Sequence, residues 1–388
     1  MTQRTGVWLV GARGSVATTV VAGAAVLAAG LAEPTGCVTE TEPLRGLPLP
    51  GFGDLVFGGH DIATVPLRKR AEQLVDAGVL PSFVPTAVAD ALDAADREIR
   101  SGVRSTADGP QARYAAGLAA DLETFREVHG LDTVVVVNLS STEPDPAPGG
   151  PPATPAELRR ALAERAGVLP PSSLYAYAAL LADCPYVDFT PSAGMRSPAL
   201  ELLAADLGVP YTGRDGKTGE TLVKSVLAPM FTRRALRVRS WSGTNLLGGG
   251  DGATLRDPEA ARSKTRSKNQ VLENILGHRV EGETHIDDVP DLGEWKTAWD
   301  HIGFEGFLGV RMTLQFTWQG CDSSLAAPLV LDLVRLMAVA RRSGASGPQP
   351  QFGFFFKDPV EEAPGTRPEH GLDAQYRELL RWAGSVRR

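Results

Sequence analysis

The chain has 388 residues, which is long for one ordinary domain and sufficient for two. Apolar residues make up 43% of it and charged residues 22%, as in an average soluble globular protein. The net charge of -7 gives no support to binding of nucleic acid or of a membrane surface, because both usually need a basic face. We therefore expect neither partner.

The cysteines and the first apolar stretch bear on location. Cys37, Cys184 and Cys321 are odd in number and far apart, which fits a reduced cytoplasm better than a disulfide framework or a zinc site. The apolar stretch from Val16 to Leu31 is rich in alanine and glycine and follows a compact strand. It predicts a buried helix, not a signal peptide or a membrane span.

The first part of the chain predicts a doubly wound α/β domain. Gly6 to Val10 is typical of a buried strand, and a glycine turn from Gly11 to Ala17 leads into the apolar helix. A Pro- and Gly-rich excursion from Pro34 to Gly53 follows. Leu55 to Asp61 and Val134 to Val137 are two further expected strands.

The glycine turn is a candidate dinucleotide site, because its backbone N–H groups can approach a pyrophosphate at the start of the helix. Dinucleotide sites usually have an acidic partner about 20 residues after the glycine turn, and this chain lacks the standard partner at that spacing. Asp61, which follows the Pro- and Gly-rich excursion, can hold the adenosine ribose in its place. The alternative is a tight turn that serves packing only.

The middle of the chain predicts a different architecture. Leu236 to Trp241 and Val310 to Trp318 alternate apolar and polar residues, which is typical of an antiparallel sheet with one covered face. Such a sheet suggests an inserted domain and an oligomer interface. After it we expect a long apolar helix over Ser323 to Arg342, a buried strand over Phe352 to Phe356 and an amphipathic helix over Gly371 to Arg388.

Two glycine-rich segments lie near this middle part. Gly213 to Thr221 is a polar loop that can cradle a phosphate through backbone amides and a hydroxyl, or can be an ordinary capped helix start. Leu246 to Gly252 carries one acid, Asp251, and permits close approach to a ligand or a plain hairpin.

Lysine is rare in this chain, with 7 among 39 basic residues, and six of the seven lie between positions 217 and 357. An ammonium can lose its proton when desolvated, whereas arginine stays charged, so the clustering favours chemistry over chance. Lys264 and Lys268 are spaced to share one helix face, which is also compatible with a solvated basic face. Lys296 lies between two tryptophans, and Lys357 follows three phenylalanines.

Taken in order, these segments resemble the inositol-phosphate synthase family, particularly its archaeal-type members. The resemblance spans most of the chain, and it is strongest over Asp215 to Val226, Leu247 to Leu255, Arg262 to Lys268, Cys321 to Leu329 and Phe354 to Pro359.

The resemblance implies an α/β fold in which an NAD-binding Rossmann domain is split in sequence. Residues 1–221 would form its first part, residues 222–321 an inserted α+β catalytic and tetramerisation domain, and residues 322–388 the return to the Rossmann domain. It also implies a homotetramer, a retained NAD+ and a divalent cation near the phosphate.

The implied activity is a redox-neutral cyclisation of a hexose 6-phosphate by C5 oxidation, enolisation, aldol closure and re-reduction. Glucose 6-phosphate would give 1L-myo-inositol 1-phosphate. An offshoot of the family makes a five-membered carbocycle from fructose 6-phosphate for nucleoside antibiotics, and Trp295, where relatives have a small polar residue, leaves that alternative open. An ordinary dehydrogenase and a non-catalytic NAD-binding regulator are further alternatives.

The resemblance also implies roles for individual residues. The catalytic set is Lys264, Lys268, Lys296, Lys357 and Asp322, in which Lys264 takes the C5 hydroxyl proton with support from Asp322. Thr218 and Gly219 would bind the substrate phosphate together with Lys268 and Lys296. The cofactor-binding set is Gly11, Ala12, Arg13, Gly14, Ser15, Val16, Asp61, Ser140, Ser141, Asp188, Asp215 and Asp251.

Overall fold

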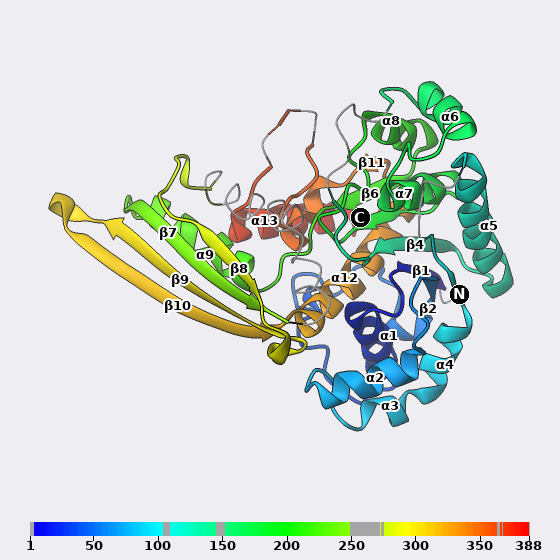
Figure 1. Ribbon diagram of the computed structural model, residues 1–388, viewed down its shortest axis with the longest axis horizontal. Coiled ribbons are helices and arrows are strands. Elements are labelled where there is room, and N and C mark those ends of the chain that lie inside the picture. Colours follow the sequence, from blue (N-terminus) through cyan, green and yellow to red (C-terminus); the bar gives the residue numbers. More distant parts are fainter. Residues whose placement is uncertain are drawn as a thin grey trace.

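The computed structural model describes residues 4–103, 109–144, 152–248, 272, 275–362, 365–366 and 368–387. The described chain forms two sheets of different character, a parallel one inside the larger part of the molecule and a second one that projects from its side (Figure 1).

The first sheet has seven strands in the order β11-β6-β5-β4-β1-β2-β3, and every neighbouring pair is parallel. Its strands are β1 (Thr5–Val10), β2 (Leu55–Asp61), β3 (Ile99–Ser101), β4 (Thr133–Asn138), β5 (Tyr186–Asp188), β6 (Pro210–Gly213) and β11 (Gly347–Pro348). The strand order reverses direction between β1 and β4, which is where doubly wound sheets bind ligands. The expected α/β fold is confirmed.

Helices cover both faces of this sheet. They are α1 (Ser15–Ala28), α2 (Leu67–Asp76), α3 (Val84–Ala87), α4 (Ala89–Arg97), α5 (Ala112–His129), α6 (Pro155–Glu164), α7 (Pro171–Leu181), α8 (Pro198–Leu207), α12 (Asp322–Arg342) and α13 (Leu372–Val386). In β1, Val7 and Leu9 join the core formed with α1 and α12, whereas Trp8 and Val10 join the core formed with α5 and α7. Burial on both faces explains why this strand is apolar after Thr5.

Among the described helices, α12 is long and apolar enough to cross a membrane by length and composition, but 78% of its most apolar window is buried inside the fold. It packs against α1, which is the buried helix expected from the first apolar stretch.

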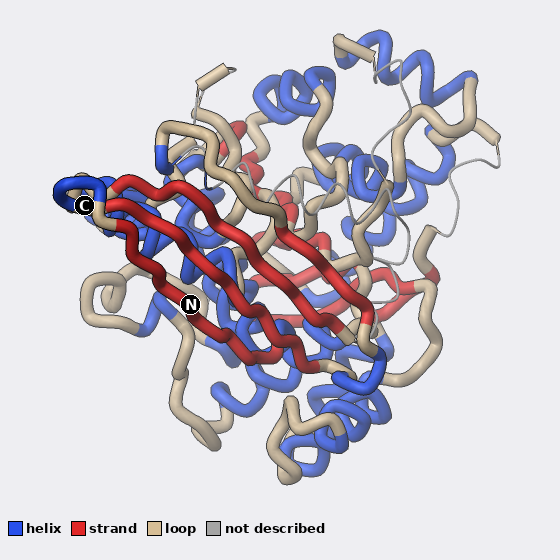
Figure 2. The backbone as a smooth tube through the Cα atoms, turned by 60° about the vertical axis from the view of Figure 1, so that its left-hand side comes forward, coloured by secondary structure: helices blue, strands red, loops and turns tan. Residues whose placement is uncertain are grey.

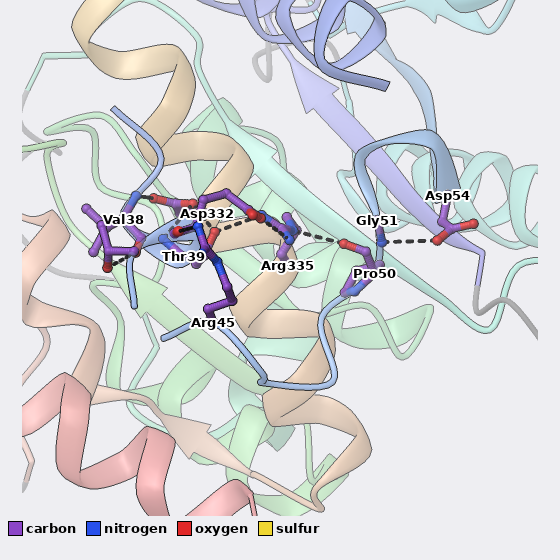
Figure 3. Close-up of polar contacts among 10 residues, drawn as sticks. Val38, Thr39, Arg45, Pro50, Gly51, Asp54, Asp332 and Arg335 are labelled. Atoms are coloured by element: carbon purple, nitrogen blue, oxygen red, sulfur yellow. Dashed lines mark hydrogen bonds and ion pairs between the residues drawn. The ribbon is translucent and has the colours of Figure 1, made fainter. Parts of the chain in front are cut away.

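A buried polar cluster fastens the Pro- and Gly-rich excursion to α12 (Figure 3). The Asp332 carboxylate accepts hydrogen bonds from the Val38 amide at 2.6 Å and from the Thr39 amide and hydroxyl. Arg335 donates to the Thr39 hydroxyl at 2.7 Å and to the Pro50 carbonyl at 2.9 Å. The excursion is thus held by the segment that returns to the first sheet.

The second sheet has four strands in the order β10-β9-β7-β8: β7 (Arg237–Leu247), β8 (Thr284–Asp288), β9 (Trp295–Glu305) and β10 (Arg311–Cys321). The two long pairs are antiparallel, as expected, but β7 and β8 are parallel. Helix α9 (Gly219–Arg233) covers one face through Ala228 and Phe231, which pack with Trp241 and Ile302. Among the described residues, no helix covers the opposite face (Figure 2).

The expected strand over Phe352 to Phe356 is wrong, because this segment is a 3-10 helix, Pro350–Phe355. Phe352 and Phe355 are three residues apart and both fully buried, and a 3-10 helix places such a pair on the same side. Pro350 favours the helix start by fixing its φ angle. The expected last helix is confirmed as α13. The domain boundaries at 221 and 321 stay a prediction; α9, which packs on the second sheet, begins at Gly219.

Candidate active site

The glycine turn lies at the carboxyl end of β1, between the ends of β2 and β4. The amides of Gly11 and Ala12 donate to the His60 carbonyl at 2.9 and 3.2 Å. Gly11 has a φ of +83°, and a Cβ there would lie 3.0 Å from the Ser140 Cα. Only glycine therefore fits the turn where it passes the end of β4.

The start of α1 suits an anion. Its N-cap residue, Gly14, has no side chain that could accept from the first amides of the helix, and the first turn carries no acidic residue. The first amides of a helix have no partner within the helix and lie at its positive end. A turn too tight for a Cβ and an uncapped helix start together fit the pyrophosphate of a dinucleotide.

Asp61 ends β2 and supports the same turn. One carboxylate oxygen accepts from the Arg13 amide at 2.6 Å, and the other accepts from the Ala63 amide at 2.7 Å. Each carboxylate oxygen has a further lone pair, so Asp61 can also accept from a ribose hydroxyl.

Two expected residues, Ser140 after the end of β4 and Asp188 at the end of β5, are linked by hydrogen bonds through Asn138. The Ser140 hydroxyl donates to the Asn138 side-chain oxygen at 2.7 Å, and the Asn138 amide group donates to Asp188 at 3.2 Å. Burial raises the pKa of the Asp188 carboxyl to about 7. Asp188 is thus enclosed behind Asn138, while Ser141 is exposed.

The loop that follows β6 pairs with the segment that follows the 3-10 helix. Arg214 donates its amide to the Asp358 carbonyl, and Lys357 donates its amide to the Asp215 carbonyl, each at 2.7 Å. This pairing brings the Lys357 ammonium to 2.8 Å from the Asp215 carboxylate, with both side chains largely buried. The sequence had suggested that Lys357 follows a strand of the sheet. It is placed instead by this backbone pairing with the loop after β6.

A second lysine–carboxylate pair lies at the other end of this loop. The Asp322 carboxylate accepts from the Lys296 ammonium and, at 3.0 Å, from the Thr218 hydroxyl. Gly219 opens α9, and a Cβ there would lie 3.5 Å from the Lys296 Cε. Three distant segments thus bring Thr218, Gly219, Lys296 and Asp322 together. Asp322 is the first residue of α12, and Cys321 is the N-cap residue of that helix.

The arrangement suits reactions that place negative charge on oxygen. Asp215 and Thr218 are three residues apart on one loop, so Lys357 and Lys296 are held at its two ends. Each ammonium is oriented by a carboxylate, and preorganised cations of this kind stabilise developing oxyanions.

Three of the expected residues, Lys264, Lys268 and Asp251, lie outside the described residues, so their roles stay predictions. Lys224 is fully buried and pairs with Glu220 and, at 3.6 Å, with Asp300. In the part of the chain that the structure describes, no group of three His, Cys, Asp or Glu side chains is placed to hold a metal ion.

Glu294 and Arg70, which had no expected role, lie beside the start of α1. The Glu294 carboxylate accepts from the Ser15 hydroxyl and from the Arg70 guanidinium, each at 2.9 Å, and the Ser323 hydroxyl lies 3.4 Å away. Glu294 therefore links the cofactor turn to the segment that carries Lys296. The sequence signal was its position two residues before a candidate lysine.

Known proteins resemble this chain in sequence over most of its length. The family model of myo-inositol-1-phosphate synthase matches residues 5–383. Inositol-3-phosphate synthase 1 of Bacteroides thetaiotaomicron is 34% identical over 97% of this chain and 94% of its own length. The mouse inositol-3-phosphate synthase 1 is 31% identical over 81% of this chain, which covers 61% of that longer protein.

A solved structure agrees in fold. The inositol-3-phosphate synthase of Caenorhabditis elegans superposes with a TM-score of 0.87 over 100% of this chain and 86% of that one, at 22% identity. Fold, ordered motifs and sequence agree over nearly the full length. The chain belongs to the myo-inositol-1-phosphate synthase family.

Proposed function

We propose that this protein is an NAD-dependent, redox-neutral cyclase that converts glucose 6-phosphate to 1L-myo-inositol 1-phosphate. The observation that carries the proposal is the loop from Asp215 to Gly219, which holds one lysine–carboxylate pair at each end. Family membership supplies the reaction class, because the relatives named above are inositol-3-phosphate synthases.

NAD+ would accept a hydride from C5 of the sugar and return it after ring closure. The glycine turn and the start of α1 would hold the pyrophosphate, and Asp61 would accept from the adenosine ribose. Asp215 lies beside Lys357 and would face the nicotinamide end of the site together with Asp251.

The substrate phosphate would lie at the start of α9. Thr218 is the N-cap residue of this helix, and Lys296 lies beside Gly219, so amides, a hydroxyl and an ammonium converge there. Lys268, implied by the resemblance, would add a second positive charge.

The remaining lysines would handle protons and oxyanions. Lys264 would take the C5 hydroxyl proton, and Lys357 would polarise that oxygen or the C1 aldehyde. In the described part of the chain Asp322 contacts Lys296 and Thr218, so we assign it to orienting Lys296 as well as to supporting Lys264.

The contacts of Trp295 remove it as an argument for fructose 6-phosphate. Its indole N–H donates to the Ala77 carbonyl at 2.9 Å, and a Cβ on Gly78 would lie 3.8 Å from the indole nitrogen. The indole therefore contacts the end of α2. This contact gives the larger side chain a structural role, so the departure from the small residue of relatives does not by itself call for a different substrate.

A product analysis tests the proposal. The purified protein is incubated with NAD+ and either glucose 6-phosphate or fructose 6-phosphate, and products are identified by NMR. We expect an inositol phosphate from glucose 6-phosphate with no accumulation of NADH. A carbocycle from fructose 6-phosphate alone would assign the protein to the five-membered-ring activity, stoichiometric NADH would make it a dehydrogenase, and NAD binding without any product would indicate a regulator.

We also propose a cytoplasmic homotetramer. The open face of the second sheet and the exposed apolar tip between β9 and β10 offer an interface, because Phe307 and Leu308 are 86% and 85% exposed. The three cysteines are free and buried, which suits a reducing compartment.

A further inference from the structure

Arg70 is the one residue of α2 whose guanidinium contacts the start of α1 in the described part of the chain. It donates to the Ser15 hydroxyl at 2.6 Å and to Glu294 at 2.9 Å, and its side chain is 27% exposed. Ser15 is the first residue of α1, so the guanidinium lies within one hydrogen bond of the helix turn that would receive the pyrophosphate.

The Ser15 hydroxyl lies between a negative and a positive side chain. The Ser15 hydroxyl donates its proton to Glu294 at 2.9 Å and accepts from Arg70. It has no second proton to offer a phosphate oxygen. A positive group must therefore offset the Glu294 carboxylate before a dianionic pyrophosphate can approach this end of α1, and Arg70 is placed to do so.

Arg70 has donors to spare. A guanidinium carries five N–H groups, and the described contacts to Ser15, Glu294 and Gln73 use three of them. The two that remain can serve phosphate oxygens, for which the planar arginine fork is well suited.

We propose that Arg70 is a cofactor-binding residue of this protein, and that its guanidinium supplies a fixed positive charge to the pyrophosphate at the start of α1. Glu294 lies beside Arg70 at the junction with the segment that carries Lys296, and the guanidinium offsets its negative charge. The inference rests on the proposed NAD site and adds to it a residue from outside the glycine turn.

The test measures binding, not turnover. The affinities of the full-length protein for NAD+, ADP-ribose and adenosine are determined by calorimetry, with adenosine in competition against NAD+. Arg70→Met should weaken NAD+ and ADP-ribose binding about tenfold or more, as expected for loss of a charge-assisted hydrogen bond, and should leave adenosine binding unchanged. Arg70→Lys should recover part of the loss.

Two further variants separate a cofactor contact from a structural clasp. Arg68→Met removes the same charge from an exposed position of the same helix and should change nothing. Glu294→Gln should leave NAD+ binding as tight as before or tighter, because it removes a negative charge beside the pyrophosphate.

The two proposals fail in different ways. If Arg70→Met and Glu294→Gln both weaken all three ligands, the pair is only a clasp between the two sheets and the inference is wrong. It is equally wrong if Arg70→Met binds NAD+ as the unmodified protein does. If the unmodified protein binds no NAD+ at all, the proposed function itself fails.

Discussion

Asp322 is the residue on which the described part of the substrate site converges, because it accepts from both Lys296 and Thr218. Its carboxylate fixes an ammonium beside the start of α9, where the substrate phosphate would lie. A neutral amide in its place has one acceptor oxygen in place of two and no negative charge, so it would hold the Lys296 ammonium more weakly.

We therefore expect Asp322→Asn to lower kcat about 100-fold or more while the affinity for NAD+ changes by less than about twofold. Turnover is measured by inositol phosphate release and cofactor affinity by calorimetry. Asp373→Asn, an exposed carboxylate on α13, is the matched control. Turnover within about twofold of the unmodified protein would remove Asp322 from the site.

Lys217 illustrates a lysine with a different task. It is almost fully buried and donates to Gln375 on α13, and burial lowers its pKa to about 7. At pH values between the pKa of Lys217 in the folded protein and the pKa of an unfolded lysine, the unfolded chain binds about one proton more than the folded chain. Raising the pH through this window therefore favours the folded state.

The prediction compares the unmodified protein with Lys217→Met by urea unfolding at pH 7.5 and pH 9.5. The free energy of unfolding of the unmodified protein should rise, relative to the variant, by about 1 kcal/mol per pH unit. Titrating groups that do not interact with Lys217 contribute equally to both proteins and cancel in the difference. Parallel pH profiles would show that Lys217 keeps its proton when folded.

At the level of elements, the second sheet has one face covered by α9 and one left open. Its β9–β10 tip carries Phe307, Leu308, Val310 and Met312, all of them exposed. Exposed apolar side chains gathered on one hairpin are typical of an interface, whereas single ones are ordinary.

Leu308→Asp should therefore shift the protein toward smaller assemblies in size-exclusion chromatography with light scattering. A charge in an interface core costs several times the stabilisation lost with the leucine side chain itself. Val128→Asp changes a 71% exposed apolar residue on α5 and should leave the mass unchanged. A monomeric unmodified protein, or a mass insensitive to Leu308→Asp, would contradict the prediction.

On the scale of the whole molecule, the two sheets are tied at the cofactor turn. Glu294 and Trp295, at the start of β9, contact Ser15 on α1 and Arg70 and Ala77 on or next to α2. Occupation of the turn should therefore stabilise both sheets together, and not the Rossmann part alone.

NAD+ at about 100 times its Kd should raise the Tm by about 3 °C, since it adds about 2.7 kcal/mol to a chain of this length, and the transition should stay single. Differential scanning calorimetry with and without NAD+ measures both. Two separate transitions, of which only one moves, would show that the second sheet unfolds independently of the cofactor site.

The local elements were largely predictable. The strand β1, the glycine turn, α1 and the acid at the end of β2 follow from apolar periodicity and from glycine at the one tight position. The alternating pattern of β10 predicted a sheet with one covered face, and the lysine bias pointed to Lys296 and Lys357. These features depend on neighbours within a few residues.

The spatial partners were decided by tertiary structure alone. Ser15 and Glu294 are 279 residues apart, and Lys357 and Asp215 are 142 apart, so no local period links them. The segment Pro350–Phe355 forms a 3-10 helix because Phe352 and Phe355 can be buried on one side against the core. The glycine turn, the helix after it and the choice of lysines are local properties of the sequence. Packing between distant segments places Asp215 beside Lys357, Asp322 beside Lys296 and Arg70 beside the cofactor turn, and no local pattern encodes these contacts.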